Sequence, residues 1–175
     1  DQASDMPPEF QTKKYFEQFQ AYASEKCKFL LIEPVVPKAS RTLSLLRERF
    51  INKGNKILSP CPHAGECPMN GFKAYTGSQN KWCNFAFSTE DAPAKLLKLS
   101  EKAKLPKERA TLAFLSVSDE IMTEAKKSQK IKVRIASDPL KIPGCKTGFY
   151  GCSALGLTLV KVMSEQSISS GDMLE

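Results

Sequence analysis

Four of the six cysteines of the chain stand in an arrangement that could hold a metal. Cys61 and Cys67 are each followed by proline, Cys83 follows Trp82, and Cys152 ends a Tyr-Gly-Cys run far along the chain. Thiolates are soft, polarisable ligands for zinc and iron. The gap between Cys61 and Cys67 is wider than in ordinary zinc knuckles, and Cys-Pro also occurs in bacterial iron–sulfur runs. The spacing favours a metal site, with isolated buried thiols or disulfides as the alternatives.

The identity of the fourth ligand is open at the level of sequence. Cys152 is the first choice, and Cys145 in the same glycine-rich stretch is its rival. His63 is the only histidine, so a site of three cysteines and His63 is possible, although a supporting contact to the ligands suits it better. Cys27 beside an apolar run reads as a small hydrophobic residue. Clear helical stretches and the lack of an evident export signal indicate a reducing compartment, where clustered cysteines are more often metal ligands than disulfides.

Other catalytic constellations find little support. With one histidine, a Ser-His-Asp or Cys-His pair would depend on the stiff Cys-Pro loop around His63. The nine glycines form neither G-x-G-x-x-G nor a P-loop. Glu33 ends an apolar run, where α/β folds place ligand contacts, so it is the candidate cofactor-binding residue, with a salt bridge or cap as the alternative. The catalytic residues are unknown.

The charge of the chain points to a polyanionic partner. Its 175 residues carry a formal net charge of +7 and a pI near 9.1. Between Lys95 and Arg134, eleven lysines and arginines stand against five acids. Contacts to RNA phosphates would use such a surface, and a solvated lysine-rich surface is the alternative. No stretch approaches the roughly 18 apolar residues of a membrane span.

Hydrophobic periodicity predicts an α/β start and a β-rich end. A helix over residues 12–25 has Tyr15, Phe19 and Tyr22 on one face, and residues 29–34 form a strand buried on both faces. A helix capped by Ser40 and ended by Gly54 follows. The further predicted elements are strands at 56–58, 82–87, 111–117, 131–135 and 155–159, and a helix over 91–104 whose inward stripe is Leu96, Leu99 and Ala103. The strand–helix–strand unit implies an α/β sheet.

The order of several motifs resembles a known family. These motifs are Leu30-Leu-Ile-Glu-Pro34, Leu45-Leu-Arg47, Ser59-Pro-Cys-Pro-His63 with Cys67-Pro68, Trp82-Cys-Asn-Phe85 and Tyr150-Gly-Cys-Ser153. In this order they are similar to the methyltransferase-like proteins associated with the small ribosomal subunit, mitochondrial and bacterial. The likeness runs from about residue 29 to 162.

The resemblance implies the C-terminal part of a Rossmann-like S-adenosylmethionine methyltransferase sheet, with a small antiparallel β appendage. It implies a 4Fe–4S cluster, with zinc as the alternative, on Cys61, Cys67, Cys83 and Cys152. It further implies small-subunit rRNA as the partner, a role in ribosome assembly or translation, and the mitochondrial matrix or a bacterial cytoplasm as the compartment. No membrane or DNA partner is expected. The main alternative is a zinc-dependent structural RNA-binding module without methyltransferase activity.

Two departures qualify the resemblance. The glycine-rich cofactor loop of the family has no counterpart in residues 1–28, so S-adenosylmethionine is expected only in a longer chain and enzymatic activity is uncertain. Asn84 stands where the family usually has histidine. The predicted organisation is a helical segment at 1–28, the methyltransferase-like part at 29–117 with its cysteine motif at 59–85, a β appendage at 118–165 that supplies Cys152, and a frayed tail at 166–175.

Overall fold

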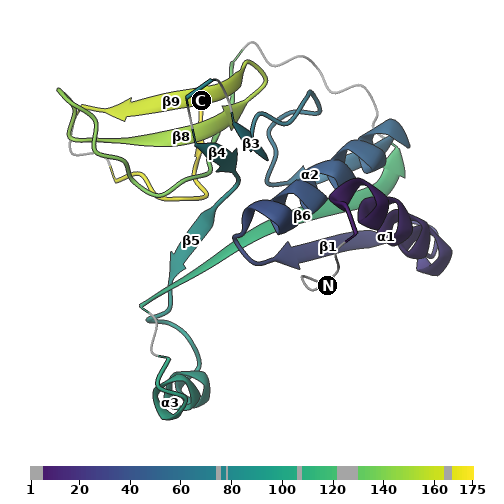
Figure 1. Cartoon of the computed structure of the whole chain (residues 1–175), viewed down its shortest axis with the longest axis horizontal. Helices are drawn as coiled ribbons and strands as arrows, with labels where there is room; N and C mark the ends of the chain where they lie inside the picture. Colours follow the sequence, from purple (N-terminus) through teal and green to yellow (C-terminus); the bar gives the residue numbers. More distant parts are fainter. Residues whose placement is uncertain (1–5, 74–75, 78, 106–107, 122–129, 164–166) are drawn as a thin grey trace.

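The described residues form two four-stranded sheets and a two-stranded one, with two helices on one face of the first sheet (Figure 1). The structure is a computed structural model that describes residues 6–73, 76–77, 79–105, 108–121, 130–163 and 167–175. The first sheet contains β1 (Lys28–Glu33), β2 (Asn55–Ser59), β5 (Phe85–Ser88) and β6 (Arg109–Ile121). Helices α1 (Pro8–Tyr22) and α2 (Pro37–Asn52) lie against one face of this sheet. The second sheet lies on the side of the molecule away from α1 (Figure 1).

The central strand of the first sheet is β6. It pairs antiparallel with β1 on one side and with β2 on the other, so β1 and β2 run parallel to each other with β6 between them. The predicted strand–helix–strand order is therefore confirmed as β1, α2 and β2. The prediction that the first strand is buried on both faces is wrong: Leu30 and Ile32 are 63% and 58% exposed, because the helices cover only the opposite face.

The core of this part lies between α2 and β6. Leu43, Leu46 and Phe50 recur at helical spacing and pack against alternate residues of β6. From α1, Tyr15, Phe16 and Phe19 complete the cluster, and the rings of Phe16 and Phe50 meet edge to face with centroids 5.1 Å apart. The aromatic stripe predicted for α1 stops at Phe19, since Tyr22 in the last turn is 89% exposed.

The ends of α2 show one wrong and one correct prediction. The helix begins at Pro37, which suits the first helical position, and Ser40 is buried in its first turn instead of capping it. The other end falls as predicted: Gly54 adopts a φ of +92° and its N–H bonds the carbonyl of Ile51 at 2.8 Å.

The second sheet has the antiparallel order β10 (Met173–Leu174), β7 (Val133–Ile135), β8 (Thr147–Ser153) and β9 (Gly156–Val162). It corresponds to the predicted appendage, although β6 runs across the boundary expected at residues 117–118. Residues 122–129 and 164–166, which the predicted segments include, lie outside the described residues. The tail is not frayed: β10 pairs with β7, and the Ile135 N–H bonds the Asp172 carbonyl at 2.9 Å.

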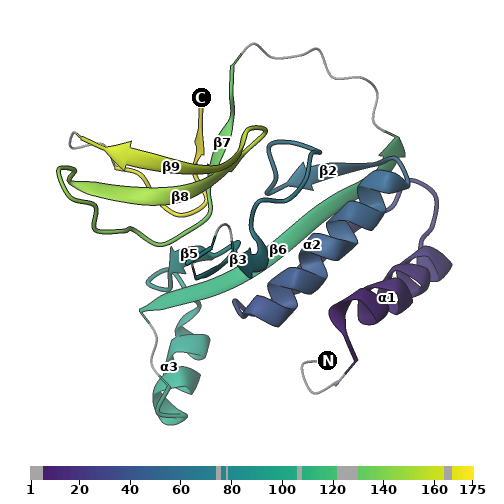
Figure 2. The same ribbon diagram turned by 45° about the horizontal axis from the view of Figure 1, so that its top comes forward.

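Two small elements lie between the sheets in sequence. The predicted strand at 82–87 is broken at Cys83 and Asn84 into β4 (Asn80–Trp82) and β5, and β4 pairs with β3 (Asn70–Lys73) in a hairpin. The predicted helix at 91–104 is the shorter α3 (Ala94–Lys102), which projects from the fold in both views (Figure 2).

The inward stripe predicted for α3 is wrong. None of its residues is buried, and Leu96 and Leu99 are 53% and 63% exposed. The helix stands on the connection between β5 and β6, away from both cores (Figures 1 and 2). None of the described helices is long and apolar enough to cross a membrane.

Candidate metal centre

The four cysteines singled out by their spacing come from separate elements. Cys61 follows β2, Cys67 precedes β3, Cys83 follows β4, and Cys152 lies within β8 of the second sheet. They are nevertheless neighbours. Cys152 is buried in an apolar cluster against which Cys67 and Cys83 pack, and a small hollow beside this cluster is lined by the first three cysteines. The thiols thus meet where the two sheets join.

Arg47 is the cationic side chain at this meeting point. It lies on the inner side of α2 and is only 4% exposed. Its Nε donates to Cys61 Sγ at 3.1 Å and its Nη2 donates to the His63 carbonyl at 2.6 Å. Neither a thiol nor a carbonyl carries a formal charge, whereas a buried guanidinium is ordinarily stabilised by an anion. An ionised sulfur at Cys61 would supply that negative charge.

His63 is in contact with Cys152. The Nε2 atom lies 3.0 Å from Cys152 Sγ, while Nδ1 is buried without a hydrogen-bond partner among the described residues. Burial, followed by the nearby Arg47 charge, lowers the pKa of His63, so the ring is neutral near pH 7. His63 thus contacts one of the four cysteines, and its supporting role toward a metal stays a prediction.

Further buried polar atoms without partners flank Cys83 in the described part of the chain. These are the indole N–H of Trp82 and the side-chain oxygen of Asn84. Buried polar groups in native proteins are nearly always satisfied, so a cluster of exceptions around one site calls for an explanation. Sulfur atoms of a bound iron–sulfur group could accept from the Trp82 indole N–H, whereas the Asn84 oxygen would still need a donor.

The thiols themselves resist ionisation when no metal is bound. Burial raises the pKa of Cys61, and it raises that of Cys83 strongly. It raises the pKa of Cys152 to about 12, with a further contribution from Cys61 and Cys67 nearby. Each thiolate would repel the others in this apolar setting. Such a set is stable as neutral thiols or as thiolates bound to a metal.

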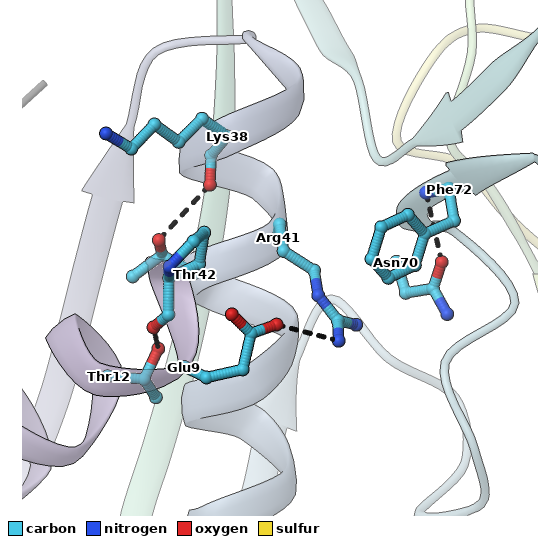
Figure 3. A network of polar contacts seen from close by, with 8 residues as sticks. Glu9, Thr12, Lys38, Arg41, Thr42, Asn70 and Phe72 are labelled. Carbon is cyan, nitrogen blue, oxygen red and sulfur yellow. Dashed lines mark hydrogen bonds and ion pairs between the residues drawn. The ribbon is translucent and has the colours of Figure 1, made fainter. Parts of the chain in front are cut away.

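The hairpin that follows Cys67 is held against α2 (Figure 3). The guanidinium of Arg41 lies 4.4 Å from the centre of the Phe72 ring and also pairs with Glu9 of α1 at 3.3 Å. Gly71 permits this approach, because a Cβ there would lie 3.0 Å from the Pro37 carbonyl and its φ is +87°. These contacts fix the chain on one side of the cysteine loop.

Arg134 fixes the other side of the loop. Its Nε donates to the Pro60 carbonyl at 2.9 Å, and its Nη1 donates to the Gly171 carbonyl. On β7 it stands opposite Cys152 in the strand register. One side chain therefore connects the second sheet to the residue preceding Cys61, and brings a second positive charge near the thiols.

The geometry of the donors bears on the kind of group that fits. Within the described ranges, no three His, Cys, Asp or Glu side chains converge enough to hold one metal ion. The four thiols lie in apolar surroundings, with two guanidinium groups nearby. Cysteine thiols are donors that both a zinc ion and an iron–sulfur cluster use.

The other candidate residues lie elsewhere. Cys145 is half-buried in a turn, where its N–H bonds the Ile142 carbonyl, outside the cluster that contains Cys152. Cys27 lies beside β1, and its carbonyl accepts from the Asp119 N–H at 3.0 Å. Glu33 ends β1 opposite Ala113 and is not among the residues that line the hollow at the cysteines. Of the two rivals for the fourth position, only Cys152 lies with the other three.

The comparison with known families decides the relationship of the chain. Residues 12–145 match the family described as mitochondrial small ribosomal subunit Rsm22. The chain belongs to this family. No individual curated protein matches it. The resemblance noted in the sequence is thereby confirmed, and a role associated with the mitochondrial small ribosomal subunit follows from family membership. The matched range contains Cys61, Cys67 and Cys83, while Cys152 lies beyond it.

Sequence reasoning missed both arginines of the site. A signal for Arg47 was present, because it occupies a position in the apolar stripe formed by Leu43, Leu46 and Phe50, where a charged side chain must find a buried partner. Arg134 gave no such signal. It alternates with apolar residues along a short strand, which is also the pattern of a solvent-facing residue.

Proposed function

We propose that the chain is the C-terminal part of a methyltransferase-like factor that acts in assembly of, or translation by, the mitochondrial small subunit in the matrix. In this proposal Cys61, Cys67, Cys83 and Cys152 hold a 4Fe–4S cluster that stabilises the fold. The cluster joins the loop after β2 to the second sheet. A bound metal stabilises the folded state most when it connects segments that are far apart in sequence.

The buried Arg47 carries this proposal. Its guanidinium donates to Cys61 Sγ from a nearly inaccessible position, which is unfavourable opposite a neutral thiol. Four thiolates around an iron–sulfur group carry net negative charge, and hydrogen bonds to cluster sulfurs are an established way for proteins to tune such groups. The same negative charge would also stabilise the guanidinium group of Arg134, which lies near the thiols.

The first experiment is purification without oxygen, followed by absorption spectroscopy and assays of iron, sulfide and zinc on one sample. The proposal expects a brown protein with a broad visible band and about four irons per chain. A colourless protein with one zinc per chain would contradict the cluster and support the alternative, a structural zinc-dependent RNA-binding module. A protein without metal would contradict both.

Cysteine variants test the ligand set. Cys67→Ser and Cys152→Ser should each lose metal and unfold at lower temperature. Cys145→Ser is the matched control, since it removes a half-buried thiol outside the cluster and should keep both metal content and stability. Full metal content in Cys152→Ser with loss in Cys145→Ser would reverse the assignment of the fourth ligand.

The methyltransferase-like fold is supported by the parallel β1–α2–β2 unit, which is typical of doubly wound sheets. The apolar side chains of Leu30 and Ile32 on the uncovered face also suit a sheet with layers on both sides. We propose that S-adenosylmethionine binds only a longer chain, with Glu33 as the candidate contact from this part. Calorimetric titration of S-adenosylmethionine into this chain and into a longer chain tests this proposal. Binding to neither chain would contradict the enzymatic interpretation.

Binding to small-subunit rRNA is supported by the net charge of +7. Phosphate contacts release counterions, so affinity for a fragment of this rRNA should fall steeply between about 50 and 200 mM salt. An affinity that does not change over that range would contradict phosphate contacts as the source of binding.

A further inference from the structure

An open pocket of about 510 Å³ lies between α2 and β3. On α2 the lining residues follow the spacing i, i+3, i+7 and i+11 of one helix face, and they are Arg41, Ser44, Glu48 and Asn52. The strand β3 contributes Asn70 and Phe72. Ala64 and Gly65 of the cysteine loop also line the pocket, and their small size leaves the space unfilled. Pockets of this volume commonly hold a small ligand.

The charges of the lining favour an uncharged ligand. Arg41 and Arg47 contribute two positive charges, and Glu48 and Glu66 contribute two negative ones. Both arginines already have polar partners, since Arg41 pairs with Glu9 at 3.3 Å and Arg47 donates to the cysteine loop. A phosphate inside the pocket would lie beside two carboxylates, and a cation would lie beside two guanidinium groups. A neutral, polar group avoids both conflicts.

Phe72 and Arg41 form a flat part of the lining. The Phe72 ring is 54% exposed and belongs to none of the three buried apolar clusters, so it is accessible to a ligand. The Arg41 guanidinium lies 4.4 Å from the centre of this ring and extends from α2 toward Phe72 and Asn70 (Figure 3). Aromatic rings and guanidinium planes are the surfaces on which proteins stack unpaired RNA bases.

The remaining side chains offer hydrogen bonds of both kinds. The amides of Asn52 and Asn70 and the hydroxyl of Ser44 can each donate and accept, whereas the Glu48 carboxylate only accepts. Asn70 is oriented by its own strand, because its Oδ1 accepts from the Phe72 N–H at 3.1 Å. The edge of a nucleobase presents donors and acceptors side by side, which such a mixed lining can match.

We propose that this pocket binds one unpaired nucleobase of the small-subunit rRNA. The base stacks on Phe72 and Arg41 and turns its edge toward Ser44, Asn52 and Asn70. This inference rests on the proposed binding of rRNA and names the site that recognises a single-stranded nucleotide. The phosphates stay outside the pocket, where the net charge of +7 attracts them. An aromatic side chain of a protein would also stack, but it would leave the amides without hydrogen-bond partners.

Crosslinking from position 72 identifies the occupant. p-Azidophenylalanine in place of Phe72 keeps the aromatic ring, and the probe is a transcript of the mitochondrial small-subunit rRNA. After illumination, reverse transcription should stop at a nucleotide in an unpaired region. The same residue in place of Phe87, an equally exposed phenylalanine of β5 outside the pocket, should not give that stop. No stop, stops only within duplexes, or the same stop from both positions would overturn the proposal.

A single-stranded oligonucleotide of the crosslinked region then measures the stacking. Phe72→Ala should weaken its binding about 5- to 100-fold, as expected for the loss of one base–aromatic stack. The slope of log affinity against log salt should stay that of the wild type, because no phosphate contact is lost. Phe72→Tyr keeps a ring and should bind like the wild type. Equal affinities of the wild type and Phe72→Ala, or a smaller salt slope in Phe72→Ala, would contradict a stacked base.

Oligonucleotides with each of the four bases at the crosslinked position test recognition of the base edge. The wild type should bind the best of the four at least about fivefold more tightly than the worst. Asn52→Leu should reduce this preference. Equal wild-type affinities for all four would overturn the hydrogen-bonded base. Binding of a free nucleoside as tight as that of the oligonucleotide would also overturn the proposal, because it would identify a site for a small metabolite.

Controls separate the pocket from the cysteines and from rRNA binding as a whole. Phe87→Ala removes an exposed ring elsewhere and should bind the oligonucleotide like the wild type. Phe72→Ala should keep the metal content and the unfolding temperature of the wild type, because its ring is in no buried cluster. If the wild type bound no rRNA at all, the proposed function would fail together with this site. If the wild type and Phe72→Ala bound rRNA equally well, only the site would fail.

Discussion

At the scale of single residues, the effect of the buried Arg47 charge on stability depends on whether the Cys61 sulfur is ionised. It is buried on α2 and donates to Cys61 Sγ. With metal bound, the guanidinium faces ionised sulfur and is stabilising. Without metal it faces a thiol whose pKa is raised by burial, and the buried charge is then a cost.

Arg47→Met should therefore have opposite effects on the two states. The metal-loaded variant should unfold at lower temperature than the wild type and bind metal roughly 10- to 100-fold more weakly, as for other residues that support metal ligands. The metal-free variant should be as stable as the metal-free wild type, or more stable. Thermal unfolding with and without chelator measures both. Arg49→Met, on the same helix but only half-buried, is the control, and equal destabilisation of both states by Arg47→Met would contradict the coupling.

At the scale of elements, the β3–β4 hairpin is held to α2 through a close backbone approach at Gly71. A methyl group there would lie 3.0 Å from the Pro37 carbonyl. Gly77 has the same φ of +87° but nothing within 4 Å of the corresponding position. The two glycines thus separate backbone strain from steric contact.

Gly71→Ala should lower the free energy of unfolding more than Gly77→Ala. Both variants bear the cost of a left-handed conformation, of order 1 kcal/mol. Gly71→Ala should add about 1–3 kcal/mol by pushing the hairpin from α2. Urea denaturation of both variants measures the difference. Equal losses would mean that the hairpin moves freely and that the position of Cys67 is not set by its contact with α2.

Local patterns explain which elements the sequence could predict. The stripe of Leu43, Leu46 and Phe50 and the terminal Gly54 specify α2 almost alone, because both signals are contained within the helix. The same reasoning failed for α3, since periodicity identifies an apolar face without showing what covers it. It also failed for the two-sided burial of β1, because an apolar run reads alike whether one face or both are covered.

The prediction of the candidate site shows a similar division between local and long-range signals. Residue type and spacing suggested Cys61, Cys67 and Cys83, which lie in one continuous stretch. Cys152 was harder to distinguish from Cys145, because the choice depends on how the second sheet packs against the first. The insertion of β6 between β1 and β2 is likewise a long-range pairing that no local pattern contains.

At the scale of the whole molecule, the cysteines and Arg134 lie at the junction of the two sheets, which the packing of Met69 and Phe85 against Ala136 also holds together. Three of the thiols belong to the segment between β2 and β5, and Cys152 belongs to β8. The α1–α2–β6 core has its own buried cluster and contains none of these thiols. Metal removal should therefore loosen one junction and leave the helical core intact.

Hydrogen exchange with and without chelator tests this division. On metal removal, amides at the junction should exchange faster, above all those of Asn84 and Ala136, which bond the carbonyls of Ala136 and Tyr150 at 3.1 and 3.0 Å. Amides of α2 and of β6 opposite β1 should keep their protection, because the buried cluster that holds them together contains none of the four thiols. Cys145→Ser should give the wild-type pattern in both states. Uniform loss of protection, α2 included, would show instead that the metal supports a single cooperative unit and that the helical core cannot persist without it.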